Sequence, residues 1–129
     1  MAQTLLDASA MLAVILEETG ADVVVEALRS GTAMSAVNAA EVAARLYQEG
    51  WGDEEVSLVF RELGIRILPF DADAALLSGR YRVATQPLGL GLGDRACLAS
   101  ASIEACPALT ADKAWEQLNL PGVDIRCIR

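Results

Sequence analysis

Short apolar runs alternate with longer amphipathic stretches along the whole chain. The apolar runs predict strands at residues 4–6, 32–35, 65–68, 108–110 and 123–128. Helical periodicity, closed in several places by glycine, predicts helices at residues 9–18, 21–29, 38–49, 53–63, 71–83, 95–105 and 112–118. One segment, TQPLGLGLGD, departs from both patterns and is predicted to be a loop.

Strands separated by helices indicate parallel β-α-β crossovers. The predicted fold is therefore α/β, a three-layer α/β/α sandwich with a central parallel sheet of four to five strands. A chain of 129 residues has the length of one ordinary domain, so residues 1–129 are expected to form a single domain. Ligands of such sheets bind beyond the carboxyl ends of the strands, and candidate chemistry is best sought there.

Four acidic residues are predicted to lie at that edge. Asp7 follows the first strand in TLLDASAML, Glu41 follows the second in NAAE, and Asp112 follows the fourth in LTADKAW. Asp94 stands where the glycine-rich loop meets a helix. Each one alone is explained as a helix cap, worth about 1 kcal/mol. Parallel topology, however, brings all four places together and predicts a shared pocket.

Because these four acids would repel one another, a bound cation is the simplest way to stabilise them together. Two carboxylates about 5 Å apart repel by roughly 3 kcal/mol at an effective dielectric constant near 20. Either some of them are protonated, or they share a positive ion. Oxygen ligands without histidine or cysteine suit Mg²⁺ or Mn²⁺ rather than zinc. Such an ion activates water and screens a phosphate, so the set is suited to phosphodiester hydrolysis.

Composition removes several other kinds of chemistry. Histidine is absent, which excludes Ser-His-Asp triads, Cys-His dyads, HExxH zinc sites and a histidine general base. The three cysteines, Cys97, Cys106 and Cys127, form no CxxC pair and are expected to be small buried hydrophobic residues.

Net charge and hydropathy limit the kinds of partner that the protein is expected to have. The net charge of −8, from 18 acidic and 10 basic residues, argues against a broad basic surface for nucleic acid and for a cationic partner or metal ions. Any local basic patch has to come from a few residues, among them Arg80, Arg82, Arg95 and Lys113. The longest apolar run, residues 10–16, is too short for a bilayer, which takes about 20 residues. With no basic leader at the N-terminus, we expect no membrane association and a cytoplasmic location.

The segments LLDASAML, SAVNAAEVAARL, LGLGDRACLASA and LTADKAW occur in this order over nearly the whole chain. In order and spacing they resemble the PIN-domain ribonucleases, and in particular the VapC-type toxins of bacterial toxin-antitoxin pairs. The resemblance implies one or two Mg²⁺ or Mn²⁺ ions held by catalytic acids, with two hydroxyls that orient carboxylates or water. The matching positions are Asp7, Glu41, Asp94 and Asp112 for the acids, and Ser9 and Thr110 for the hydroxyls.

The resemblance also implies an activity and partners. The activity is that of a metal-dependent endoribonuclease, which hydrolyses RNA phosphodiester bonds and is inhibited by a cognate small antitoxin that places basic residues in the acidic pocket. A homodimer is often found in this family.

Two alternatives stay open. One is a Mg²⁺-binding phosphoacceptor signalling domain, for which Lys113 is poorly placed and Glu41 has no role. The other is a non-catalytic binding protein with a PIN-like fold.

The sequence GLGLGD is not taken as a nucleotide fingerprint. Its spacing is G-x-G-x-G rather than G-x-G-x-x-G, and no clear strand runs directly into it. The loop is instead expected to bring Asp94 into the pocket, with Leu88, Leu90 and Leu92 packed beneath it. Trp115, at helical spacing from Leu118, is expected to belong to the core.

Overall fold

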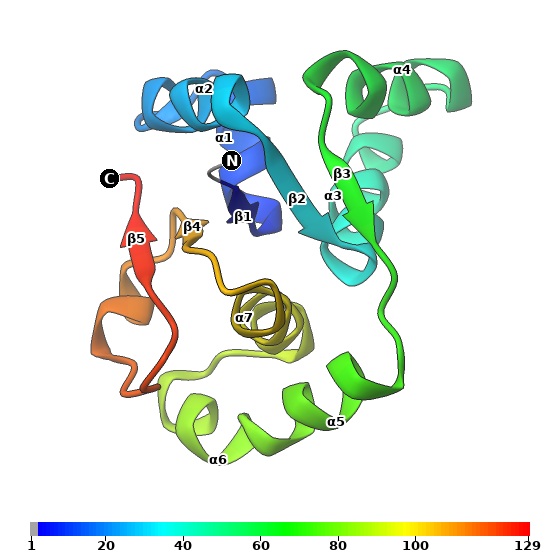
Figure 1. The fold of residues 1–129 in the computed structure, drawn as a ribbon. Helices are drawn as coiled ribbons and strands as arrows, with labels where there is room; N and C mark the ends of the chain where they lie inside the picture. Colours follow the sequence, from blue (N-terminus) through cyan, green and yellow to red (C-terminus); the bar gives the residue numbers. More distant parts are fainter. Residues whose placement is uncertain (1–2) are drawn as a thin grey trace.

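A five-stranded parallel sheet lies at the centre of the computed structural model, which describes residues 3–129 (Figure 1). The strands are β1 (Thr4–Leu6), β2 (Thr32–Ser35), β3 (Arg66–Leu68), β4 (Ala108–Thr110) and β5 (Ile125–Cys127). Their order is β3-β2-β1-β4-β5, and each neighbouring pair is parallel. The predicted α/β fold with a central parallel sheet is confirmed.

The strand order also locates the point where the topology reverses. From β1 the chain adds β2 and then β3 on one side, and it returns to place β4 and β5 on the other side of β1. Ligands of open parallel sheets bind at such a switch point, beyond the carboxyl ends of the strands. The expected location is therefore the gap between the ends of β1 and β4.

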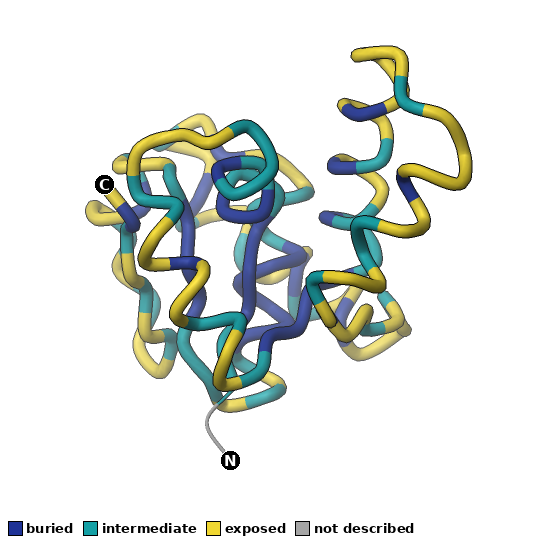
Figure 2. Tube along the Cα trace, turned by 90° about the horizontal axis from the view of Figure 1, so that it is seen from above, coloured by how far each residue is buried: buried dark blue, intermediate teal, exposed yellow. Residues whose placement is uncertain are grey.

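Helices cover both faces of the sheet (Figure 1). They are α1 (Ala8–Ile15), α2 (Ala21–Ser30), α3 (Ala36–Gln48), α4 (Asp53–Leu63), α5 (Ala72–Arg80), α6 (Arg82–Thr85) and α7 (Leu92–Glu104), with short 3-10 helices η1 (Gln86–Leu88) and η2 (Lys113–Gln117). The pair α3 and α4 extends to one side of the sheet, next to β3 (Figures 1 and 2). In residues 3–129 no helix has the length and apolar character needed to cross a membrane.

Two hydrophobic cores form because successive strand residues point to opposite faces. Leu6 and Met34 belong to the core under α1, α2, α3 and α4, whereas Leu5 and Ala33 belong to the core under α7 and η2. All four side chains are fully buried. Figure 2 shows the buried residues gathered in the strands and in the helix surfaces that meet them. Trp115 lies in the second core, as predicted.

The glycine-rich loop is shorter than predicted. Its first part forms η1, and α7 already begins at Leu92, three residues before the predicted start of this helix. Asp94 is therefore the third residue of α7, where its Oδ2 accepts a hydrogen bond from the Gly91 amide at 2.9 Å. The Leu92 side chain is exposed, so its predicted packing beneath the loop is wrong. Leu90 is buried as expected.

Other helix boundaries shift because caps are difficult to place from apolar spacing. Helix α3 begins at Ala36, since the Ser35 hydroxyl accepts a hydrogen bond from the Val37 amide at 3.2 Å and caps it. Asn38, the predicted first residue, is thus inside the helix. The predicted helix 71–83 is divided at Tyr81 into α5 and α6, and the predicted helix 112–118 is the 3-10 helix η2.

The cysteines follow the expectation in part. Cys97 is fully buried in the second core, and burial raises its pKa well above the ordinary value. Cys106 and Cys127 are half-buried, and burial raises their pKa values as well. All three thiols are free and held in the protonated, less reactive form.

Candidate active site

One pocket at the carboxyl end of the sheet gathers the predicted acids. Its lining comes from the turn after β1, from α1, α3 and α7, and from the turn after β4. The lining residues are Asp7, Ala8, Ser9, Leu12, Asn38, Glu41, Asp94 and Asp112. The four acids, which are distant in sequence, thus meet beside the switch point between β1 and β4.

Asp7 is the most deeply buried acid of this pocket, with 4% of its surface exposed. Its Oδ1 accepts a hydrogen bond from the Ala10 amide at 2.8 Å, which caps α1, and a second from the Ser9 hydroxyl at 2.7 Å. Its Oδ2 accepts a hydrogen bond from the Thr110 hydroxyl at 2.6 Å. Asp7 is therefore a helix cap and a pocket acid at the same time.

Ser9 and Thr110 hold this carboxylate from two sides. Ser9 Oγ accepts a hydrogen bond from the Ala111 amide at 2.9 Å, and Thr110 Oγ1 accepts one from the Asp112 amide at 3.1 Å. Each hydroxyl has a single proton, and each donates it to Asp7. The end of β1 is thereby joined to the end of β4, and the orientation of the carboxylate is fixed.

Burial and negative neighbours make ionisation of the pocket acids costly. Desolvation raises the pKa of Asp7 to about 6 against the lowering effect of its three hydrogen bonds, and the charge of Asp94 adds to the rise. The pKa of Asp94 is raised mainly by burial and further by the charge of Asp112, whereas the Gly91 amide opposes the rise. Without a positive charge, two adjacent carboxylates are thus shifted toward their neutral forms.

Glu41 reaches the pocket from α3, and two residues that the sequence did not mark as site residues lie against its carboxylate, Asn38 and Gly93. Its Oε1 accepts a hydrogen bond from Asn38 Nδ2 at 2.9 Å, and the same nitrogen donates to the Gly93 carbonyl of α7 at 2.9 Å. The i, i+3 spacing of Asn38 and Glu41 was visible in the sequence, but it suggests a helix cap. The contact with Gly93, which spans 55 residues, had no local signal.

Asp112 and Trp115 complete the edge near β4. Asp112 caps η2, since its Oδ1 accepts a hydrogen bond from the Ala114 amide at 3.0 Å. The Trp115 indole is buried, its N–H has no hydrogen-bond partner within residues 3–129, and it is close enough to lower the pKa of Asp94. The indole N–H thus partly offsets the effect of burial on the pKa of Asp94.

The donor chemistry of the pocket fits a hard divalent cation. The side-chain atoms of its lining that could bind a metal are carboxylate, hydroxyl and amide oxygens, which Mg²⁺ and Mn²⁺ prefer. Asp94 and Asp112 each use one oxygen as a cap, and within residues 3–129 the other oxygen accepts no hydrogen bond. Among residues 3–129, however, no three acidic or cysteine side chains converge tightly enough to enclose an ion by themselves. Water molecules, which Mg²⁺ usually retains, would complete the coordination.

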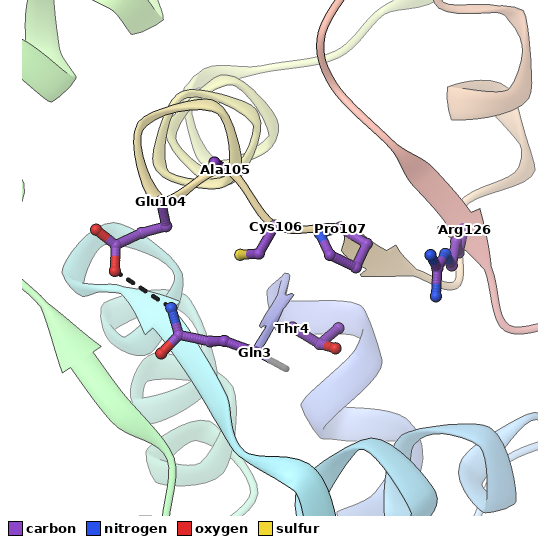
Figure 3. Close-up of a pocket in the computed structure, with 7 residues that line it drawn as sticks. All are labelled: Gln3, Thr4, Glu104, Ala105, Cys106, Pro107 and Arg126. Carbon is purple, nitrogen blue, oxygen red and sulfur yellow. Dashed lines mark hydrogen bonds between the residues drawn. The ribbon is translucent and has the colours of Figure 1, made fainter. Parts of the chain in front are cut away.

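A second pocket lies at the opposite, amino-terminal edge of the sheet (Figure 3). Gln3 Nε2 donates to Glu104 Oε1 at 3.2 Å, and Arg66 binds both of these side chains. Cys106 also lines this pocket. None of the four predicted acids lies there, and its charged groups are already paired, so the pocket at the carboxyl edge is the candidate active site.

A family model described as PIN domain matches residues 4–120 of the chain. The chain belongs to the PIN domain family. PIN domains are nucleases, so a hydrolytic nuclease activity is the coarse functional assignment. The expected family resemblance is confirmed. No curated protein matches the chain.

Solved structures share the PIN fold over almost the full length. VapBC2 from Rickettsia felis bound to a DNA fragment from its promoter is 15% identical, with a TM-score of 0.73 over 97% of this chain and 98% of that one. DNA-bound VapBC from Salmonella typhimurium is 17% identical, with a TM-score of 0.73 over 100% of both chains. A toxin-antitoxin complex from Klebsiella pneumoniae is 20% identical, with a TM-score of 0.72 over 98% of both. At these identities the likeness shows the fold alone.

Proposed function

We propose that this PIN domain is a metal-dependent endoribonuclease toxin of the VapC type, which hydrolyses RNA phosphodiester bonds with Mg²⁺ or Mn²⁺. The observation that carries the proposal is the convergence of four acids on one pocket at the switch point, with the most buried of them held by three hydrogen bonds. Family membership supports nuclease chemistry. The oxygen-only donor set supports the metal.

In this proposal Asp7 and Asp94 are direct ligands, and Glu41 and Asp112 complete the pocket or act through bound water. A divalent cation would supply a water of lowered pKa and screen the phosphate charge. The protein itself does the rest. Ser9 and Thr110 keep the Asp7 carboxylate fixed, and the buried floor of the pocket strengthens every charge interaction within it.

The proposed inhibitor is a cognate small antitoxin. The structures of similar fold include complexes named as VapBC or toxin-antitoxin pairs, and the acid pocket of this chain is rich in carboxylates. A basic segment of a partner would neutralise these charges and compete with the cation. The net charge of −8 favours such a partner. A homodimer in the cytoplasm completes the proposal.

A phosphoacceptor signalling domain suits the pocket less well. It needs a lysine at the acidic site, and no lysine lines this pocket within the described chain. Its phosphorylated aspartate also has to be accessible, whereas the most central acid, Asp7, is almost entirely buried.

Cleavage of single-stranded RNA by the wild-type protein, with Mn²⁺ and with EDTA, tests the nuclease. Asp7→Asn removes a ligand charge but keeps the size of the side chain, so the cleavage rate should fall by at least a hundredfold, the scale of losing one strong charge interaction in a transition state. EDTA should abolish cleavage. If wild type and variant are equally inactive on diverse RNAs while a basic partner still binds tightly, the protein is a non-catalytic binder.

A further inference from the structure

We infer that Asn38 and Gly93 are positioning residues that together fix the Glu41 carboxylate between α3 and α7. The inference rests on the proposed function, because it assigns their task to the metal site of that nuclease. Asn38 has 1% of its surface exposed and lines the acid pocket. One Nδ2 hydrogen is donated to Glu41 Oε1 and the other to the Gly93 carbonyl, both at 2.9 Å.

The two acceptors settle the orientation of the Asn38 amide. With the amide reversed, its Oδ1 would face two oxygen acceptors, so only the observed orientation is favourable. In this orientation Oδ1 is buried and has no hydrogen-bond partner within residues 3–129. An amide oxygen left unpaired in the interior is unfavourable for stability. The Asn38 side chain therefore holds Glu41 through Nδ2, while its own Oδ1 has no partner within residues 3–129.

Gly93 provides the space that the Glu41 carboxylate occupies. A Cβ atom on Gly93 would lie 2.4 Å from each of the two Glu41 carboxylate oxygens. Gly93 is inside α7, where alanine is the better helix former. The absence of a side chain at this position is therefore explained by the approach of Glu41, and not by the helix.

The two residues act on Glu41 in complementary ways. Asn38 binds the carboxylate from within α3, and Gly93 lets it lie against α7, one residue before Asp94. The carboxylate ends a flexible side chain, so loss of either restraint lets it turn away without unfolding the helices. The expected consequence is a weaker metal site in a folded protein.

Gly93→Ala is the sharper of two tests, and Gly79→Ala is its matched control. Both glycines are helical, but a Cβ on Gly79 would have no atom within 4 Å. Mn²⁺ binding is measured by isothermal titration calorimetry and the unfolding midpoint is measured in EDTA. Gly93→Ala should weaken Mn²⁺ binding at least tenfold while its midpoint stays at or above the wild-type value. Gly79→Ala should leave Mn²⁺ binding unchanged.

Asn38→Ala gives the second, independent test, with Asn119→Ala as control. Asn119 is the other asparagine of the chain, and it is exposed and does not line the pocket. Asn38→Ala should weaken Mn²⁺ binding at least tenfold and lower kcat for RNA cleavage, and Asn119→Ala should do neither.

The outcomes separate the inference from the proposed function. If wild type binds Mn²⁺ and cleaves RNA while Gly93→Ala and Asn38→Ala bind Mn²⁺ within twofold of wild type, the positioning role alone is overturned. If wild type neither binds Mn²⁺ nor cleaves RNA, the proposed nuclease is overturned and this inference with it.

Discussion

Single residues can cap a helix and line the acid pocket at the same time, and Asp7 is the clearest case. Its carboxylate caps α1 through the Ala10 amide, and the same carboxylate is held by Ser9 and Thr110 at the edge of the acid pocket. A cap on the surface would be stabilising when ionised. Buried beside Asp94, the Asp7 carboxylate instead has a raised pKa, so its ionisation opposes folding until a positive charge is bound.

The pH dependence of stability should reveal this cost. The pKa of Asp7 rises from 3.8 to about 6 on folding. Between these values the unfolded chain releases a proton that the folded protein keeps, so stability falls as the pH rises and the full loss, about 3 kcal/mol, is present above the folded pKa. In EDTA, Asp7→Asn should therefore gain stability relative to wild type by up to that amount between pH 4 and pH 7. A stability difference that stays constant over this range, measured by urea unfolding, would contradict the raised pKa.

At the scale of elements, the junctions decide where helices end and how the layers meet. Gly20 precedes α2 with a φ of +94°, and a Cβ there would lie 2.6 Å from the Ile128 carbonyl oxygen at the end of the chain. Gly64 ends α4 with a φ of +66°, and a Cβ there would meet nothing within 4 Å. Both glycines allow a left-handed backbone, but only Gly20 also allows a close approach between two segments.

Alanine at the two junctions should separate these effects. Gly64→Ala should cost about 1 to 2 kcal/mol of unfolding free energy, because only the left-handed conformation is penalised. Gly20→Ala should cost a further 1 to 3 kcal/mol, since the backbone at Ile128 has to move and this residue belongs to the first core. Urea unfolding curves give both values. Equal losses for the two variants would show that the C-terminal segment does not pack against Gly20.

At the scale of the whole molecule, the distribution of charge would limit how the proposed RNA substrate approaches. Five of the ten basic residues are paired with acids: Arg29, Arg45, Arg66, Arg126 and Arg129. Lys113, next to Asp112, makes no ion pair within residues 3–129. Arg61 makes none within these residues either, but it lies on α4, a helix that packs on α3 and does not line the pocket. A basic side chain near the acids that makes no ion pair, such as that of Lys113, would be available to bind an RNA phosphate.

The salt dependence of RNA binding tests this distribution. In an Asp7→Asn background, which prevents cleavage, Lys113→Ala should weaken binding and reduce the slope of log affinity against log salt by about 0.7, the value for one lost phosphate contact with a single strand. Arg61→Ala changes the net charge equally and should leave the slope unchanged. Identical slopes for both variants would show that Lys113 does not contact phosphate.

The sequence by itself determined the layout of the fold and the position of the acids along it. Apolar runs predicted all five strands. The reason is clearest for β1, β2 and β4, which are almost wholly buried and therefore favour apolar residues, whereas the edge strands β3 and β5 are partly exposed. Three of the acids followed from their places after strands, and Asp94 followed from its place between the glycine-rich loop and a helix. Helix boundaries were less predictable, since Ser35 and the Gly91–Asp94 pair cap α3 and α7 through contacts that compete with apolar spacing.

Only the tertiary structure decided how the pocket is held. Thr110 bonds Asp7 across 103 residues, and Asn38 bonds Gly93 across 55. Contacts at such separations leave no periodicity in the chain, and a polar residue that makes them looks like an ordinary helix or strand residue. The exposure of Leu92 had the same origin, because the face that a side chain presents depends on where its helix begins. Local pattern therefore set the elements, and long-range packing set the geometry of the site.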